Sequence, residues 1–331
     1  MIGDSRNRAI GIGIGIGVAG ALAIGLRYGL RRSPRQNIPD DISPAIFARR
    51  LSTTSRGDMV YHISGSGRPV VFLHGVYPGA SSFEWSRVSP HFAIGHEVIA
   101  ADLVGFGESE RPPDALDASG YAESLADFLY EVCGSRQPVV VASGLTSTFA
   151  LLMASRHPER LGELVLVAPE THVSRAPWAR RGLALAARVR PLATFLYRTS
   201  FAREAFLTSW IASFGFADPS KADASIARNL AVCAQQPGAR HAVLQDLCGG
   251  LAANLSGRLD RIPHPVTFVH AETPDGAPPP VCRQLSAGLS RAAFVQIPPS
   301  KALAALEVPV AVCAALGQVL GSGWPPAQEA A

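Results

Sequence analysis

The sequence lacks several features that would assign it to a well-marked class of protein. Lysine occurs only at Lys221 and Lys301, and charged residues make up only 17% of the chain. The net charge of +4 is scattered and forms no basic stripe with interleaved aromatic residues, so we expect no nucleic-acid partner. The five cysteines are odd in number and widely spaced, with no C-x-x-C pair. Neither a disulfide framework nor a zinc site is therefore indicated, and we expect no cofactor.

The length and the apolar content, in contrast, are ample for a large core. A chain of 331 residues with 47% apolar residues suits one large α/β domain with an insertion, or two domains.

The N-terminus carries an uncharged run, residues 9–26, with arginines on both sides. As a helix it would span about 27 Å, close to the roughly 30 Å hydrocarbon core of a bilayer. Four of its glycines, Gly11, Gly13, Gly15 and Gly17, have overlapping G-x-x-x-G spacings that would allow a second helix to approach. We expect a transmembrane anchor with capacity for self-association. A cleaved signal peptide and a disordered low-complexity tail remain as alternatives.

More arginines follow this run than precede it, which predicts a globular part facing the cytoplasm. The unpaired cysteines agree with a reducing compartment. The polar, proline-bearing stretch of residues 31–44 is a reasonable linker, so residues 1–35 are assigned to the anchor and linker.

From about Leu51, short runs rich in valine and isoleucine alternate with segments of helical pattern. Such alternation is typical of an α/β fold with a parallel sheet. The expected strands are Met59–Ile63, Pro69–Leu73, Glu97–Ala101, the three valines after Pro138, Leu161–Ala168, Pro265–Val269 and Ala293–Ile297, and Val308–Leu320 is the closing helix.

The segment 138–158 carries the pattern on which the functional interpretation of the sequence depends. A buried strand stops at Ala142-Ser143-Gly144 and passes without a linker into a helix, Phe149–Ser155, which is closed by His157-Pro158. Strand, sharp turn and helix form the context of a nucleophile elbow, in which G-x-S-x-G lifts a serine above a sheet. Here the turn is present without the serine.

Other segments strengthen a family resemblance. His74-Gly75 follows a buried strand, and Asp102–Ser109 reads D-L-x-G-x-G-x-S. Ser82–Trp85 reads S-x-E-W, a helix start with Ser82 as a plausible N-cap. Together these motifs resemble the α/β-hydrolase superfamily, most closely its capped esterase, epoxide-hydrolase and haloalkane-dehalogenase members.

The resemblance implies an α/β-hydrolase fold: a mostly parallel central sheet with helices on both faces and a helical cap insertion. Its core would comprise residues 45–170 and 260–322, and the cap residues 171–259. The fold by itself does not give the function.

In this family the elbow nucleophile lies fourteen residues before the proline that ends the helix. Counting back from Pro158 reaches Gly144, with small Ala142 and Thr146 two residues away on either side. Glycine offers no nucleophile.

Other registers place the nucleophile at Ser143, at Thr146 or at Ser147. Ser143 would put Val141 and Leu145 at positions that require small residues. Thr146 is sterically tolerable but lies half a turn into the helix.

The family's oxyanion hole consists of the amide of the residue after H-G and the amide after the nucleophile. Carried over, these amides belong to Val76 and Leu145, with Gly75 and Tyr77 beside them. For His74 itself we favour a structural role.

For the acid of the triad, the resemblance leads to Pro274, one residue from Asp275 and near Glu272, and some relatives use the position of Glu170. Each of these carboxylates can also be a solvated turn residue. The histidine position, five residues before Glu307, is occupied by Ala302, and no histidine occurs after His270.

The nucleophile and the base are thus missing at two independently counted positions. One interpretation is a membrane-tethered protein that has lost Ser-His-Asp hydrolysis and keeps an apolar pocket for a small molecule. The alternative is an active hydrolase of small ester- or epoxide-like substrates with rearranged groups such as Thr146. The sequence names no substrate.

Overall fold

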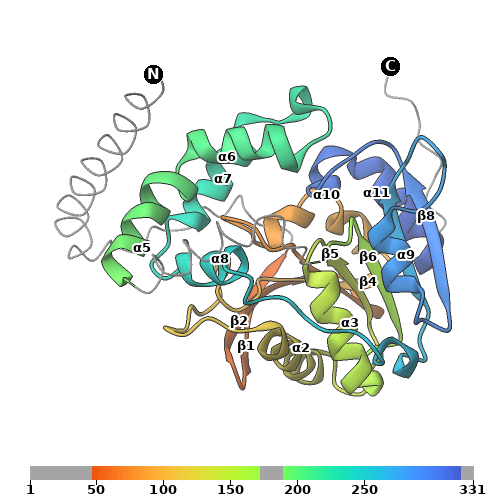
Figure 1. The fold of residues 1–331 in the computed structure, drawn as a ribbon. Coiled ribbons are helices and arrows are strands. Elements are labelled where there is room, and N and C mark those ends of the chain that lie inside the picture. Colours follow the sequence, from red (N-terminus) through yellow and green to blue (C-terminus); the bar gives the residue numbers. More distant parts are fainter. Residues whose placement is uncertain (1–46, 172–188, 322–331) are drawn as a thin grey trace, which may run out of the picture.

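A computed structural model describes residues 47–171 and 189–321. Its centre is an eight-stranded sheet in the order β1-β2-β4-β3-β5-β6-β7-β8 (Figure 1). The strands are β1 (Ala48–Thr54), β2 (Gly57–Ser64), β3 (Arg68–Leu73), β4 (His96–Ala101), β5 (Val139–Ser143), β6 (Glu163–Val167), β7 (Val266–Ala271) and β8 (Ala292–Ile297).

The sheet is mostly parallel, because only the β1–β2 and β2–β4 pairs are antiparallel. The valines of β3, β5 and β6 are buried on both faces, as a parallel sheet between helical layers requires. The α/β-hydrolase fold class predicted from the sequence is confirmed, and so are the expected strands. The sequence analysis missed β1, whose first residues are exposed at the edge of the sheet.

Two apolar clusters cover the two faces of the sheet. The helices α2 (Ala118–Cys133) and α3 (Thr146–Arg156) lie on one face together with the cap residues. The helices α10 (Ala304–Glu307) and α11 (Pro309–Leu320) lie on the other face. The remaining helix of the C-terminal part is α9 (Pro280–Ser286).

Between β6 and β7, the described residues form helices and no strand. They are α5 (Arg190–Leu196), α6 (Glu204–Trp210), α7 (Ala224–Ala234) and α8 (Arg240–Leu247), with π-helical turns at Tyr197–Phe201 and Ile211–Gly215. Their buried side chains, Leu207 and Leu230 among them, belong to the same apolar cluster as α2 and α3. We call this helical layer over the sheet the cap. Residues 172–188 of the expected cap lie outside the described residues.

The short helix that contains the S-x-E-W motif begins one residue earlier than expected. Ser81 is the N-cap of the 3-10 helix Ser82–Trp85, here η2, and its side chain makes no capping hydrogen bond. Ser82 is the first helical residue, and its N–H donates to Asp102 Oδ1 (2.6 Å). The prediction of Ser82 as the N-cap is therefore wrong, because the chain enters this helix bonded to Asp102 at the end of β4.

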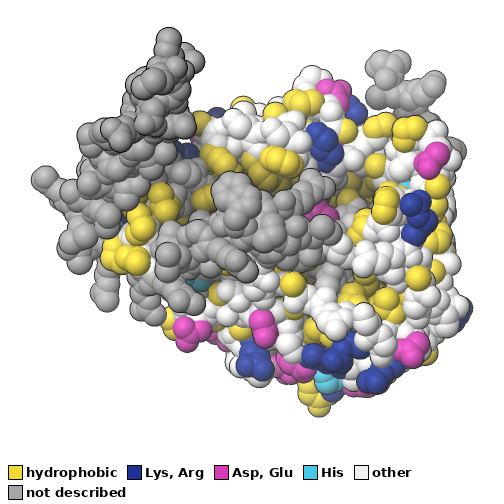
Figure 2. All heavy atoms as spheres, viewed as in Figure 1, with side chains coloured by type: hydrophobic (Ala, Val, Ile, Leu, Met, Phe, Trp, Pro, Cys, Tyr) yellow, Lys and Arg dark blue, Asp and Glu magenta, His cyan; other side chains and the backbone are white. Residues whose placement is uncertain are grey.

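The expected membrane anchor, residues 9–26, lies outside the described residues. None of the helices in the described part of the chain is long and apolar enough to cross a bilayer. On the face drawn in Figure 2, side chains of both charge signs lie interspersed over α2 and α3.

Candidate functional site

The turn between β5 and α3 has the backbone of an elbow. Gly144, directly after the last residue of β5, has φ +54°. Its N–H donates to the Val167 carbonyl (3.1 Å) and its carbonyl accepts from the Glu170 N–H (3.1 Å). A Cβ added at Gly144 would meet only the Gly75 Cα, at 3.8 Å, so a side chain has room there. Positive φ is unfavourable for every residue with a Cβ, and it is typical of the strained nucleophile position.

The loop after β3 lies against this turn through Gly75. Thr146 Oγ1, in the first turn of α3, donates to the His74 carbonyl (2.6 Å), so the loop and the turn form one unit. Within the part of the chain that the structure describes, the N–H groups of Val76 and Leu145 make no hydrogen bond. These are the two amides that the family resemblance assigns to an oxyanion hole.

His74 is fully buried and has a structural environment. Its Nε2 accepts from the Leu103 N–H (3.0 Å), so Nδ1 must carry the proton that it donates to the Gly75 carbonyl (2.7 Å). Burial lowers the pKa of His74, which favours this neutral tautomer. His74 therefore joins the loop to the start of the β4–α2 connection, and these contacts agree with the structural role expected for it.

The most unusual group of the site was not predicted from the sequence. Glu84, in η2, is only 1% exposed. Its Oε2 accepts from the Gly75 N–H (2.8 Å) and from Tyr77 Oη (2.9 Å), while Oε1 has no hydrogen-bond partner among the described residues. Burial raises the pKa of Glu84 to about 7. Nearby Glu170 contributes to this rise, whereas the neighbouring Ser143 hydroxyl and the hydrogen bonds from Gly75 and Tyr77 oppose it.

Tyr77 connects this carboxyl group to the cap. Its ring is stacked on Trp210 of α6, with centroids 5.1 Å apart and planes at 22°. Burial and the neighbouring Glu84 raise the pKa of Tyr77, so its hydroxyl remains a donor. The signal in the sequence was an acidic residue between Phe83 and Trp85, but its burial depends on segments far away in the chain.

The two carboxylates considered for the acid position differ in their surroundings. Glu170 is exposed, but its backbone is bonded to Gly144 and its charge acts on Glu84. Asp275 lies in an exposed turn, where a hydrogen bond with Thr273 lowers its pKa and Oδ1 accepts from the Ala277 N–H (3.3 Å).

At the expected base position, Ala302 lies in the connection before α10. Its N–H donates to the Phe214 carbonyl of the cap (3.3 Å), and Lys301 Nζ donates to the Ser213 carbonyl (2.8 Å). His270, at the end of β7, is buried with Nδ1 bonded to the Ala271 carbonyl (2.9 Å). This part of the chain thus supplies backbone contacts to the cap and no imidazole at the position of Ala302.

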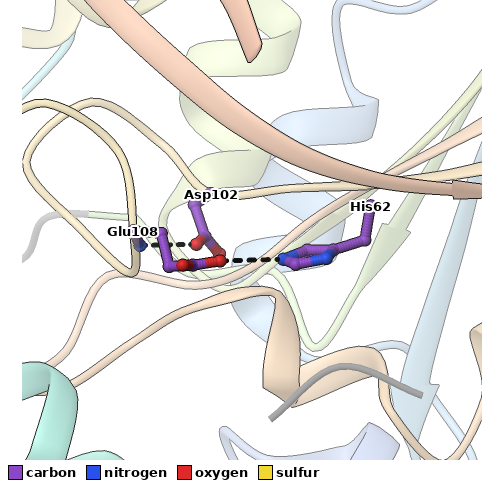
Figure 3. Close-up of side chains that lie close together, drawn as sticks. All are labelled: His62, Asp102 and Glu108. Atoms are coloured by element: carbon purple, nitrogen blue, oxygen red, sulfur yellow. Dashed lines mark hydrogen bonds and ion pairs between the residues drawn. The ribbon is translucent and has the colours of Figure 1, made fainter. Parts of the chain in front are cut away.

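A second cluster joins His62, Asp102 and Glu108, whose ligand atoms lie within 4.8 Å of one another (Figure 3). Asp102 Oδ2 accepts from the Glu108 N–H (2.7 Å), and Glu108 is paired with His62 (3.5 Å) and Arg49 (3.1 Å). These separations by themselves would allow an ion, because two ligands that each lie about 2.0–2.6 Å from a metal can be about 4–5 Å apart. Arg49 already supplies a positive charge to Glu108. We therefore assign this cluster a structural role in the D-L-x-G-x-G-x-S loop.

A cavity of about 660 Å³ lies beside the first turns of α3. Thr148 is on its wall, with the connection 252–257 and α9 opposite. Thr148 Oγ1 donates to the Glu170 carbonyl (3.1 Å), which places the cavity next to the segment bonded to Gly144.

Comparison with known proteins agrees with this geometry. A family model described as alpha/beta hydrolase fold matches residues 68–307. A 2-hydroxymuconate semialdehyde hydrolase of Pseudomonas sp. (strain CF600) is 37% identical over 132 residues, which are 40% of this chain and 46% of the relative. A 2-hydroxy-6-oxo-2,4-heptadienoate hydrolase of Pseudomonas putida is 33% identical over 133 residues, which are again 40% of this chain and 46% of the relative. The matches thus span less than half the length of these relatives.

Among solved structures, a thermophilic esterase from Thermogutta terrifontis has a TM-score of 0.65 at 18% identity, covering 83% of this chain and 98% of that one. An enol-lactonase from Burkholderia xenovorans has a TM-score of 0.66 at 15% identity, covering 82% of this chain and 100% of that one. At such identities the likeness shows the fold alone. The family match, which covers well over half of the chain, shows more: the chain belongs to the alpha/beta hydrolase fold family.

Proposed function

We propose that this protein has lost Ser-His-Asp hydrolysis and binds a small apolar carbonyl compound at the elbow. The observation that carries the proposal is Gly144 at φ +54°, at the sharp turn between β5 and α3. An elbow without a side chain has nothing to attack a carbonyl carbon. The absence of any histidine after His270 removes the base in its usual place in the chain order.

The unbonded N–H groups of Val76 and Leu145 support binding rather than a purely structural role. Two backbone donors beside an elbow suit a ligand oxygen, and their desolvation is costly if nothing accepts from them. Val76, Tyr77 and Leu145, beside the turn, belong to or pack against the larger apolar cluster, so the surroundings of a ligand oxygen held there would be largely apolar. The names of the two relatives give a muconate semialdehyde and an oxo-heptadienoate as their substrates, but the match covers too little of their length to transfer a substrate.

An active hydrolase with rearranged groups is the alternative. Thr146 is a weak candidate nucleophile because it is fully buried and its hydroxyl donates to the His74 carbonyl. Glu170 and Asp275 remain as the candidate carboxylates.

Labelling with a fluorophosphonate probe separates the two proposals. We expect no labelling of the wild type, and little of Gly144→Ser, because a serine hydroxyl without a base is a weak nucleophile. Gly144→Ala is the matched control, since it adds the same Cβ without the hydroxyl. Robust wild-type labelling that neither substitution changes would place the chemistry elsewhere and refute the proposal.

Restoring the base as well extends the test. With a p-nitrophenyl ester we expect activity to rise from wild type to Gly144→Ser to the double variant that adds Ala302→His. General-base assistance is typically worth about 10²–10⁴-fold, so the last step reports whether Glu170 or Asp275 can orient the new imidazole.

We also propose that residues 9–26 tether the protein to a membrane, with the globular part in the cytoplasm. The uncharged run and the arginines after it support the proposal.

A further inference from the structure

A buried carboxyl group lies directly behind the loop that carries the proposed oxyanion donors. Glu84 Oε2 accepts a hydrogen bond from the Gly75 N–H (2.8 Å), so this amide is not available to a ligand. The next amide along the chain, that of Val76, is the one left without a partner among the described residues. Glu84 thus determines which N–H of the loop faces a ligand.

The groups around Glu84 exclude water from its carboxyl group and supply no opposite charge to it. Tyr77 covers the carboxyl group on one side and is itself stacked under Trp210 of the cap. Oε1 accepts no well-formed hydrogen bond from the described residues, and Ser143, next to Gly144, makes a weaker polar contact that favours the charged carboxylate. A carboxyl group that is so deeply buried and has so few hydrogen bonds is unusual, which indicates that the group serves the site.

The charged and titratable groups on the neighbouring elements are mostly acidic. Asp102 accepts from the first N–H of η2, and α10, which packs against η2, carries buried Glu307. Arg87, two residues after η2, donates to the Leu306 carbonyl (3.0 Å). Among the described residues, the titratable and charged groups on these elements are His74 and Tyr77 after β3, Asp102 after β4, Glu170 after β6, Glu307 on α10 and Arg87. No cation among the described residues forms an ion pair with Glu84.

We propose that the carboxylate of Glu84 makes the elbow site select neutral carbonyl ligands, such as esters and ketones, and reject carboxylates. The inference rests on the proposed function of the elbow as a binding site. A neutral carbonyl oxygen can accept from the Val76 and Leu145 amides with little regard to Glu84. A ligand carboxylate at the same donors would meet a like charge across one loop, in a region from which water is excluded. At an effective dielectric constant near 20, such repulsion weakens binding roughly tenfold or more.

The selectivity should depend on pH in a defined direction. Burial places the ionisation of Glu84 near pH 7, so the group is charged above this pH and neutral below it. Carboxylate ligands should therefore bind more weakly as the pH rises through about 7, whereas neutral ligands should be indifferent.

The test compares two probes of equal length, hexanoate and methyl hexanoate, on the full chain by calorimetry from pH 5.5 to 8.5. For wild type we expect the ratio of the hexanoate Kd to the ester Kd to rise about tenfold over this range. In Glu84→Gln the amide oxygen can still accept from Gly75 and Tyr77. The ratio of the two Kd values should then stay at its low-pH value from pH 5.5 to 8.5. Glu84→Asp keeps the charge and should keep the pH dependence.

Glu170→Gln is the matched control. It removes a nearby negative charge that raises the pKa of Glu84, so the midpoint should move to lower pH while the size of the change remains. If Glu84→Gln does not fold, the wild-type and Glu170→Gln profiles decide on their own.

Three outcomes would count against the inference. A flat ratio in the wild type, or an unchanged pH dependence in Glu84→Gln, overturns it and leaves the proposed binding function standing. Failure of both probes to bind at every pH overturns the proposed function and this inference together.

Discussion

Replacing Gly144 by alanine measures how much of the elbow depends on glycine. An L-residue at φ near +54° loses about 1–2 kcal/mol relative to glycine. The lower entropy of the unfolded alanine chain returns about 0.4–1 kcal/mol. The added Cβ meets only the Gly75 Cα at 3.8 Å, so no steric cost is added. We expect a net loss of about 1 kcal/mol in the free energy of unfolding.

Two other glycines provide matched controls for this value. Gly321, the C-cap of α11, is left-handed with φ +66° and ψ 8° and has nothing within 4 Å of an added Cβ, so Gly321→Ala should lose a similar amount. Gly79 has φ +80°, and a Cβ there would overlap the Leu230 carbonyl oxygen in the cap. Gly79→Ala should therefore lose several kcal/mol.

Urea unfolding followed by circular dichroism measures all three variants. We expect Gly321→Ala and Gly144→Ala to lose similar amounts of stability, and both to lose much less than Gly79→Ala. If Gly144→Ala costs as much as Gly79→Ala, the space at the elbow is not what the structure indicates. If it is neutral or stabilising, the positive φ at Gly144 is wrong.

Three further predictions concern other parts of the molecule. Because the folded pKa of Glu84, about 7, lies above its unfolded value near 4.5, its contribution to stability should fall by roughly 3 kcal/mol as the pH rises from about 4.5 through 7. Glu84→Gln should remove this fall in urea titrations at pH 5 and pH 8, and an unchanged fall would contradict the assignment. Thr146→Val leaves the buried His74 carbonyl without its 2.6 Å donor and should cost about 1–3 kcal/mol by the same assay, with no effect on fluorophosphonate labelling. Full-length protein should fractionate with membranes and a variant starting at Arg35 should not; equal solubility of the two would refute the anchor.

The sequence by itself determined the parts that depend on local chemistry. The runs of valine predicted the buried strands, since side chains of this kind suit a sheet covered on both faces. Counting residues placed Gly144 at the sharp turn, and the turn has the positive φ that glycine tolerates best. The edge strand β1 was missed because Arg49 and Arg50 make its pattern polar, as an exposed edge allows.

Only the tertiary structure decided the surroundings of the site. Glu84 is charged or neutral near pH 7 because segments distant in the chain, including Ser143 and Glu170, enclose it. The Leu103 N–H donates to His74 Nε2 and so determines which ring nitrogen of His74 carries the proton. Thr146 donates to the carbonyl of His74, 72 residues away in the chain. Such properties arise from burial and from the direction of donors across the fold, and no local pattern encodes either of them.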